Sequence, residues 1–274
     1  ILLDGGMGTM LQAAGLKLGA RPEELNITDP ALIEGIHAQY AAAGSRIVNA
    51  NTFGASAHKL AGSAYTLEQV IAAGIANCKR ACAPYGALTA LDVGPLGELL
   101  EPSGTLGFED AVAEYARIVK AGEAAGADLI FFETYTDLYE LKAALLAAKE
   151  NTRLPILASM SFEAGGRTFT GCTVESFAAT ARGLGADAVG INCSLGPKEI
   201  FPMAKRLAEA VPGNFPVFVK PNAGLPRADG SGYDITPQLF ALQMKPYRGL
   251  HLFAAGGCCG TTPEFIKLLN GTFA

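Results

Sequence analysis

Two short motifs contain three cysteines that could bind one metal ion. Cys193 lies within an Asn-Cys-Ser segment, and Cys258 and Cys259 are adjacent within a Gly-Gly-Cys-Cys-Gly segment. Neighbouring residues of a regular strand point to opposite faces, so both thiols of the pair reach one ion only if the backbone turns, which the flanking glycines permit. Three thiolates without a histidine in either motif favour Zn²⁺, which binds sulfur at about 2.3 Å.

The charge of such a site indicates its chemistry. Three protein ligands leave a fourth position open, which is typical of a catalytic rather than a structural zinc site. The charges of three thiolates and Zn²⁺ sum to about −1, so the ion lowers the pKa of a bound water less than it does when three neutral histidines bind it. It suits instead a substrate thiol, which it holds as a thiolate near neutral pH while the sulfur stays nucleophilic. We therefore predict attack by that sulfur on an activated methyl group.

The alternative interpretation is that these cysteines only fill an apolar core, as buried cysteines often do. The surrounding glycines and the position after expected strands favour the metal site. Cys78 and Cys82, four residues apart in an expected helix, are predicted to pack, and Cys172 is predicted not to be a ligand. A disulfide between adjacent cysteines would be strained, so we expect reduced thiols. The histidines show no metal-ligand spacing and are predicted to be structural or surface residues: His37, His58 and His251.

Short apolar runs alternate with longer helical patterns along the chain. Eight runs are mostly continuous in apolar residues, as expected for parallel strands covered on both faces. They are Ile1–Leu3, Arg46–Asn51, Ala87–Val93, Asp128–Glu133, Pro155–Ser161, Ala186–Cys193, Pro216–Pro221 and Leu250–Ala255. The helical patterns are Pro30–Ala43, Thr66–Ala83, Phe108–Ala125, Leu138–Glu150, Val174–Leu184, Pro197–Val211 and Pro237–Arg248. This alternation predicts an α/β fold, a (β/α)8 TIM barrel, with an open doubly wound sheet as the alternative.

The same pattern predicts the domain organisation and the location of the site. The chain has 274 residues and no linker or low-complexity tract, so we expect one barrel domain over residues 1–274. Glycines after three helical patterns, at Gly44, Gly126 and Gly185, predict helix C-caps. Active residues of such barrels follow the C-terminal ends of the strands. The three motif cysteines and several polar residues of this chain occupy those positions.

Two carboxylates and a glycine-rich turn are further candidates at these strand ends. Asp92 and Glu133 end two expected strands, and either could bind a substrate ammonium group; the alternative for each is a buried structural hydrogen bond. Residues Asp4–Thr9 follow the first expected strand, and their backbone N–H groups could face an anion. The alternative there is a tight-packing turn. The segment matches neither the dinucleotide fingerprint nor the phosphate-loop motif.

Composition excludes several functional classes. Hydrophobic residues make up 50% and charged residues 17% of the chain, which excludes a disordered protein. The formal net charge of −5 argues against nucleic-acid binding. No run of about 18 apolar residues occurs, so we expect no membrane span. The first residues do not resemble a signal peptide, and we expect a cytoplasmic protein.

Eight segments carry motifs that are similar to those of one enzyme family. They are Asp4–Thr9, Pro22–Asn26, Asn51–Ala55, Gly94–Pro95, Phe132–Thr134, Gly190–Ser194, Pro221–Gly224 and Gly256–Glu264. The chain resembles the homocysteine S-methyltransferases, and most of all the homocysteine-binding domain of cobalamin-dependent methionine synthases. The resemblance spans nearly the whole chain, and the paired-cysteine and Asn-Cys-Ser motifs are its most specific parts.

This resemblance implies a (β/α)8 barrel with zinc on Cys193, Cys258 and Cys259 and with the homocysteine sulfur in the open zinc position. It also implies that the amino-acid end of the substrate lies near the turn after the first strand, with Glu133 as the partner of the ammonium group. The backbone contacts expected there are Gly5, Gly6, Met7 and Gly8. Asn222 could cap zinc through its carboxamide when substrate is absent, which we infer from its position only.

The sequence leaves more than one candidate for the methyl donor. The segment Pro22–Asn26 and the residues after Gly260 favour the methionine synthase type, for which methylcobalamin is the donor. The chain contains no folate-binding module, no cobalamin-binding module and no Asp-x-His-x-x-Gly signature, so we expect a fragment or a stand-alone domain that meets a corrinoid protein or domain. The alternatives are a stand-alone enzyme that uses S-methylmethionine or betaine, and a non-catalytic zinc-binding domain.

Overall fold

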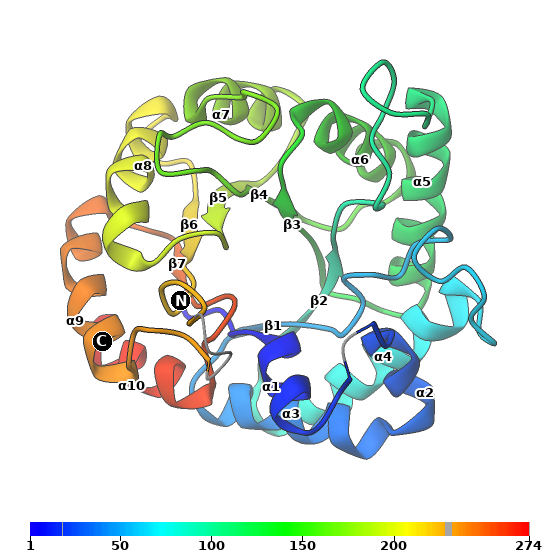
Figure 1. Cartoon of the computed structure of the whole chain (residues 1–274), viewed down its shortest axis with the longest axis horizontal. Helices are drawn as coiled ribbons and strands as arrows, with labels where there is room; N and C mark the ends of the chain where they lie inside the picture. The colour runs from blue at the N-terminus through cyan, green and yellow to red at the C-terminus, as the bar shows by residue number, and fades with distance from the viewer. Residues whose placement is uncertain (18, 228–231, 274) are drawn as a thin grey trace.

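Seven parallel strands form one curled sheet in the computed structural model, which describes residues 1–17, 19–227 and 232–273 (Figure 1). Each strand pairs with the next along the chain. The strands are β1 (Ile47–Asn49), β2 (Leu88–Val93), β3 (Leu129–Tyr135), β4 (Ile156–Met160), β5 (Ala188–Asn192), β6 (Val217–Lys220) and β7 (Ala254–Ala255). A doubly wound sheet reverses its strand order partway, so this consecutive order does not match the open alternative.

Helices follow the strands and surround the sheet (Figure 1). The α-helices are α1 (Met7–Ala13), α2 (Leu25–Thr28), α3 (Pro30–Ala42), α4 (Leu67–Cys82), α5 (Phe108–Ala124), α6 (Leu138–Asn151), α7 (Val174–Gly183), α8 (Pro197–Ala210), α9 (Pro237–Met244) and α10 (Pro263–Phe273). Short 3₁₀-helices are η1 (Pro22–Glu24), η2 (Ala83–Tyr85) and η3 (Lys245–Leu250). Asp29 caps α3 through its side chain. Gly44, Gly126 and Gly185 have φ values of 112°, 85° and 90°, which confirms the predicted glycine C-caps.

The expected first strand is present only as two bridging residues. Leu2 pairs in parallel with Ala255 of β7, and Leu3 pairs in parallel with Ile47 of β1. The N-terminal segment therefore contacts both edge strands of the curled sheet. The described structure thus supports seven strands of the predicted eight, with Leu2 and Leu3 between the first and the last of them.

The prediction was wrong at the last strand and incomplete at the chain ends. Only Ala254 and Ala255 of the expected strand Leu250–Ala255 are in the sheet, because Leu250 ends η3 and His251 has a left-handed φ of 50°, which does not fit a strand. The helical patterns also gave no sign of α1, η1, α2 and α10. Since α1 begins at Met7, the glycine-rich turn ends at Gly6, and Gly8 lies within a helix. No described helix is long and apolar enough to cross a membrane.

One layer of apolar side chains fills the interior of the curled sheet below the strand ends. Its members are Leu3, Ile47, Ala90, Leu129, Phe131, Leu157, Ala188, Phe218 and Ala254. The rings of Phe131 and Phe218 lie 5.0 Å apart. Gly190 on β5 allows this packing, because a Cβ atom there would lie 2.3 Å from the ring of Phe218. The layer closes the interior at this level, so the polar strand ends are left to form a site.

Candidate active site at the strand ends

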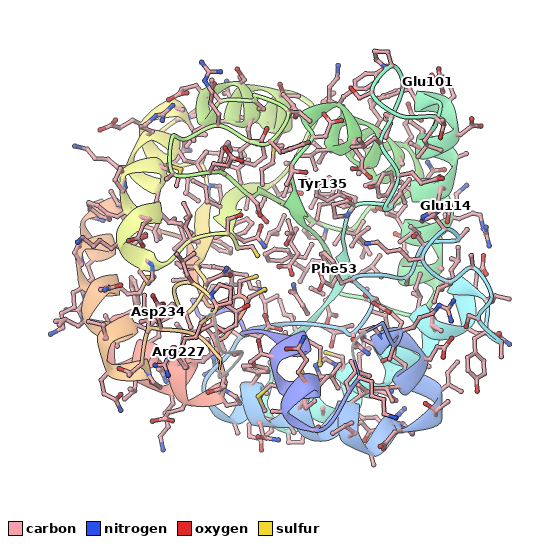
Figure 2. The ribbon with its side chains drawn as sticks, in the orientation of Figure 1. Phe53, Glu101, Glu114, Tyr135, Arg227 and Asp234 are labelled. Atoms are coloured by element: carbon pink, nitrogen blue, oxygen red, sulfur yellow. The ribbon has the colours of Figure 1, made fainter. Side chains whose placement is uncertain are left out.

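A cavity of about 330 Å³ lies among the C-terminal ends of the strands. Figure 2 shows side chains projecting into the ring of strands, with Phe53, a cavity residue, on the side of β1 and β2. Nine of the ten predicted site residues line this cavity: Gly5, Gly6, Met7, Gly8, Asp92, Glu133, Cys193, Cys258 and Cys259. Asn222 is buried behind the wall and does not line it.

The three motif cysteines converge at one end of the cavity. Their sulfur atoms all lie within 4.8 Å of one another, and the sulfurs of Cys193 and Cys259 are 3.7 Å apart. Sulfurs bound tetrahedrally to one zinc ion at about 2.3 Å would be separated by about 3.8 Å. Cys193 reaches this position with φ of 62°, a left-handed conformation that is uncommon for a residue with a side chain. The donor set therefore fits a thiophilic metal ion.

The electrostatics of the cluster also indicate a cation. Hydrogen bonding to a neighbouring thiol and burial raise the pKa of Cys193 to about 12 and that of Cys259 to about 12. For Cys258, contact with Cys193 lowers the pKa, but contact with Cys259 and burial raise it further, to well above its usual range. Three thiolates at these distances repel one another, so the deprotonated cluster requires a bound positive charge.

Two asparagines, one at the end of β5 and one just after β6, hold the cysteine segments in place. Asn192, which is fully buried, points its Nδ2 at the sulfur of Cys258 at 3.8 Å and donates to Thr134 Oγ1 at 2.7 Å. Its Oδ1 accepts from the backbone N–H of Thr134 at 2.9 Å. Asn222 Oδ1 accepts from the backbone N–H of Cys259 at 3.1 Å. Sequence reasoning missed Asn192, although its position beside Cys193 at a strand end was a usable signal.

A buried lysine organises the other end of the cavity. Lys220, at the end of β6, is 2% exposed, and its Nζ lies 2.9 Å from Asp4 and 3.1 Å from Glu133. Its ammonium group also lies 5.1 Å from the centre of the Phe131 ring. Sequence reasoning missed Lys220, but a lysine within the apolar run at Pro216–Pro221 must be paired if that run is buried.

Three buried carboxylates, Asp4, Asp92 and Glu133, gather at this end of the cavity, and two of them, Asp4 and Glu133, pair with the lysine. Burial raises the pKa of Asp4 although Lys220 opposes the shift. Burial and the neighbouring Glu133 raise the pKa of Asp92 well above its usual range. Asn49 donates its backbone N–H to Asp4 at 2.7 Å and its amide N–H to Glu133 at 3.3 Å. This end of the cavity thus contains more acidic groups than basic ones, which suits a cationic ligand group.

The turn after the first expected strand is packed too tightly for side chains. A Cβ atom on Gly5 would lie 2.7 Å from Thr261 Oγ1, and one on Gly6 would lie 2.8 Å from the carbonyl oxygen of Cys258. The N–H of Gly6 faces the backbone and side-chain oxygens of Thr261 at 3.3 and 3.2 Å. Gly5 and Gly6 therefore join the first strand to the cysteine segment, as the tight-packing interpretation predicts.

The remaining cysteines and histidines lie outside the cavity. Cys78 and Cys82 are buried in α4 with their sulfurs 3.8 Å apart, and Cys172 donates to the carbonyl of Thr173 at 3.3 Å. His37 is buried, and burial lowers its pKa to about 3. His58 faces Glu98 at the surface, and His251 ends η3. These positions agree with the predicted packing and surface roles.

Comparison with known proteins decides the family. The sequence profile of the family described as homocysteine S-methyltransferase matches residues 1–273. The chain belongs to the homocysteine S-methyltransferase family. This homocysteine S-methyltransferase homologue is 32% identical over 287 residues to a methionine synthase of Mycobacterium tuberculosis and 33% identical over 289 residues to one of Mycobacterium leprae. Each match covers 96% of the chain, which spans about a quarter of either relative, 24% and 23%.

A solved structure supports the fold. The metallated form of the homocysteine methyltransferase MmuM from Escherichia coli superposes with a TM-score of 0.84 at 24% identity, over 99% of this chain and 96% of that one. At this identity the likeness is evidence of a shared architecture, so the curled parallel sheet surrounded by helices is common to both proteins.

Proposed function

We propose that this family member catalyses zinc-dependent methyl transfer to the sulfur of homocysteine, which gives methionine. The observation that carries the proposal is the three-cysteine cluster, which opens into the same cavity as an acidic end suited to an amino group. In the reaction a bond forms between the methyl carbon and the homocysteine sulfur, the bond to the donor breaks, and the thiol proton is released. The family and the names of the mycobacterial relatives support this reaction.

Cys193, Cys258 and Cys259 are the proposed zinc ligands. Bound to these three thiolates, Zn²⁺ would bind the substrate thiol as well and keep it deprotonated near neutral pH. Asn192 orients Cys258, and Asn222 holds the backbone of Cys259, so both act as positioning residues. The role of Asn222 as a zinc cap remains a prediction.

The acidic end of the cavity is the proposed site of the amino-acid part. Glu133 and Asp92 bind the ammonium group of the substrate, while Lys220 keeps Glu133 and Asp4 in fixed positions. The backbone of the turn and of the start of α1 contacts this amino-acid part through residues Gly5, Gly6, Met7 and Gly8. We further propose that residues 1–274 are one domain, that Leu2 and Leu3 serve as the eighth barrel strand, and that the protein is cytoplasmic.

The proposed donor is methylcobalamin carried by a separate domain or corrinoid protein. A cavity of about 330 Å³ accommodates an amino acid but not a corrinoid, so the carrier must present its methyl group at the cavity mouth. The methionine synthase relatives are about four times longer than this chain, which leaves them room for a carrier domain. The second candidate is a stand-alone enzyme that uses S-methylmethionine or betaine, and the fold shared with the homocysteine methyltransferase MmuM is compatible with it.

The deciding experiment is methyl transfer in vitro. The protein is incubated with homocysteine and methylcobalamin, S-methylmethionine or betaine, with and without a zinc chelator, and methionine is measured by mass spectrometry. We expect chelator-sensitive methionine formation from methylcobalamin. Turnover of S-methylmethionine or betaine without a corrinoid would favour the second candidate. Full activity of metal-free protein would contradict the zinc mechanism, and absence of both activity and homocysteine binding would indicate a non-catalytic domain.

A further inference from the structure

Two neighbouring residues of β3 face the cavity, which a regular strand does not allow. Successive side chains of a strand point to opposite faces, yet Glu133 and Thr134 both line the cavity. The ladder between β3 and β4 shifts its register between Phe132 and Tyr135, as it does at a β-bulge. Bulges beside active sites redirect side chains, so this one accounts for the position of Thr134.

The backbone of Thr134 is strained at this point. Its φ is 66°, in the left-handed region, which is a genuine outlier for a residue with a branched Cβ. Tyr135, the next residue, returns to the helix side of the sheet, where its ring lies 6.2 Å from that of Tyr115 on α5. The strain therefore turns Thr134 alone into the cavity, and strained residues of this kind cluster at functional sites.

Asn192 fixes the direction of the hydroxyl hydrogen of Thr134. Asn192 Oδ1 accepts from the backbone N–H of Thr134 at 2.9 Å, so exchanging the amide oxygen and nitrogen would bring two donors together. Asn192 Nδ2 therefore donates to Thr134 Oγ1 at 2.7 Å, and the hydroxyl is the acceptor in this contact. Its hydrogen must point elsewhere, and no acceptor for it lies among the residues that the structure describes.

This unused donor lies beside the cysteine cluster. Asn192 Nδ2 contacts both Thr134 Oγ1 at 2.7 Å and the sulfur of Cys258 at 3.8 Å, so the hydroxyl and the sulfur are neighbours of one nitrogen atom. The sulfur of the proposed acceptor joins this cluster, whereas its amino-acid part belongs at the other end of the cavity. A thiolate is a charged acceptor, and hydrogen bonds to charged groups are stronger than those between neutral groups.

We propose that Thr134 donates a hydrogen bond to the sulfur of the acceptor and thereby stabilises it as a thiolate beside the cysteine cluster. This inference rests on the proposed function and adds to it a catalytic residue that touches the reacting atom. The thioether sulfur of methionine is neutral and a weak acceptor, so it gains little from the same hydroxyl. Thr134 therefore makes the site hold the acceptor more tightly than the product.

The test compares homocysteine with methionine, which has the same amino and carboxylate groups but a methylated sulfur. Titration calorimetry measures the affinity of the zinc-loaded wild type, Thr134→Val and Thr134→Ser for both ligands, and chelator competition measures the zinc affinity of each protein. Valine has the shape of threonine without the hydroxyl, whereas serine keeps the hydroxyl. We expect Thr134→Val to weaken homocysteine binding about tenfold or more and to change methionine binding by less than about twofold. Thr134→Ser should bind both ligands like the wild type.

Ser159→Ala is the matched control. Ser159 Oγ lies 2.9 Å from the same Oδ1 atom of Asn192, but Ser159 does not line the cavity. Its replacement therefore disturbs Asn192 without removing a donor to the substrate. This variant should keep the wild-type ratio of the homocysteine and methionine affinities.

Each other result overturns the proposal in a recognisable way. If Thr134→Val weakens both ligands equally, or lowers the zinc affinity, Thr134 only supports the structure of the site. If Thr134→Ser binds homocysteine as weakly as Thr134→Val, the hydroxyl is not the group that matters. If Thr134→Val does not fold, Thr134→Ala is measured instead, with the same expected change in ratio. A zinc-loaded wild type that does not bind homocysteine would refute the proposed function as well.

Discussion

Replacing Lys220 with methionine should destabilise the protein severely. Lys220 is 2% exposed and pairs with Asp4 at 2.9 Å and with Glu133 at 3.1 Å, so its removal leaves buried carboxylates without their cation. Methionine fills a similar volume, which keeps the packing loss small. Breaking a buried ion pair by removing one partner costs about 3–5 kcal/mol. We expect the free energy of unfolding at pH 7 to fall by about that amount.

The pH dependence of this loss tests its electrostatic origin. Burial lowers the pKa of Lys220, but the neighbouring carboxylates outweigh it and hold that pKa well above its ordinary value of 10.5. The wild-type pairs therefore persist below pH 10.5 and weaken only as the pH rises beyond the raised pKa. In Lys220→Met the uncompensated carboxylates bind protons more readily. The difference in free energy of unfolding between the wild type and this variant should therefore shrink as the pH falls from about 7 to about 5.

Urea unfolding of the reduced, metal-free protein, monitored by circular dichroism, measures the loss in free energy of unfolding and its dependence on pH. Lys205→Met is the matched control, because Lys205 is exposed and its contact with Glu209 is 3.8 Å long. That variant should stay within about 0.5 kcal/mol of the wild type. A deficit below about 1 kcal/mol for Lys220→Met, or one that does not change with pH, would refute the reasoning.

Three further predictions concern the metal, a buried histidine and a glycine. Cys193→Ala should abolish stoichiometric zinc binding in a chelator competition assay, whereas Cys172→Ala should bind zinc like the wild type. Because zinc binds the thiolate and the pKa of Cys193 is about 12, the zinc affinity of the wild type should fall as the pH is lowered. His37 has a folded pKa of about 3 against 6.5, so the unfolded state binds an extra proton as the pH falls below 6.5 and stability declines. His37→Leu should remove about 2 kcal/mol of that decline between pH 7.5 and pH 5, and an unchanged pH profile of unfolding would contradict this. Gly190→Ala should lower the free energy of unfolding by about 1–3 kcal/mol, since its Cβ would meet the Phe218 ring; a thermal melt equal to the wild type would show that the ring can move aside.

The features that could be predicted from the sequence are those that a residue carries in its own type or local pattern. The thiols of Cys193 and Cys258 are ligand groups for zinc, so the residue type alone indicates a metal site. Continuous apolar runs such as that before Glu133 indicate buried parallel strands. Glycine after a helical pattern, as at Gly126, predicts a helix end because its positive φ is a local property. These signals need no knowledge of distant partners.

The features that were missed depend on contacts between segments far apart in the chain. Lys220 lies 216 and 87 residues from its partners Asp4 and Glu133, so nothing near it in the sequence indicates its ion pairs. Asn192 is held by Thr134 from another strand. The last strand is shorter than expected because Leu250 ends η3 and the left-handed φ of His251 keeps the start of the apolar run out of the sheet.

The apolar layer around Phe131 and Phe218 has a kinetic consequence. Because it closes the ring of strands beneath the cavity, the acceptor and the product must pass through the same mouth at which a methyl carrier would dock. A large carrier seated there blocks that passage. Turnover with such a carrier should therefore follow a compulsory-order mechanism, in which the thiol binds first and the carrier leaves before methionine does. High carrier concentrations should slow the reaction by trapping the product in the cavity.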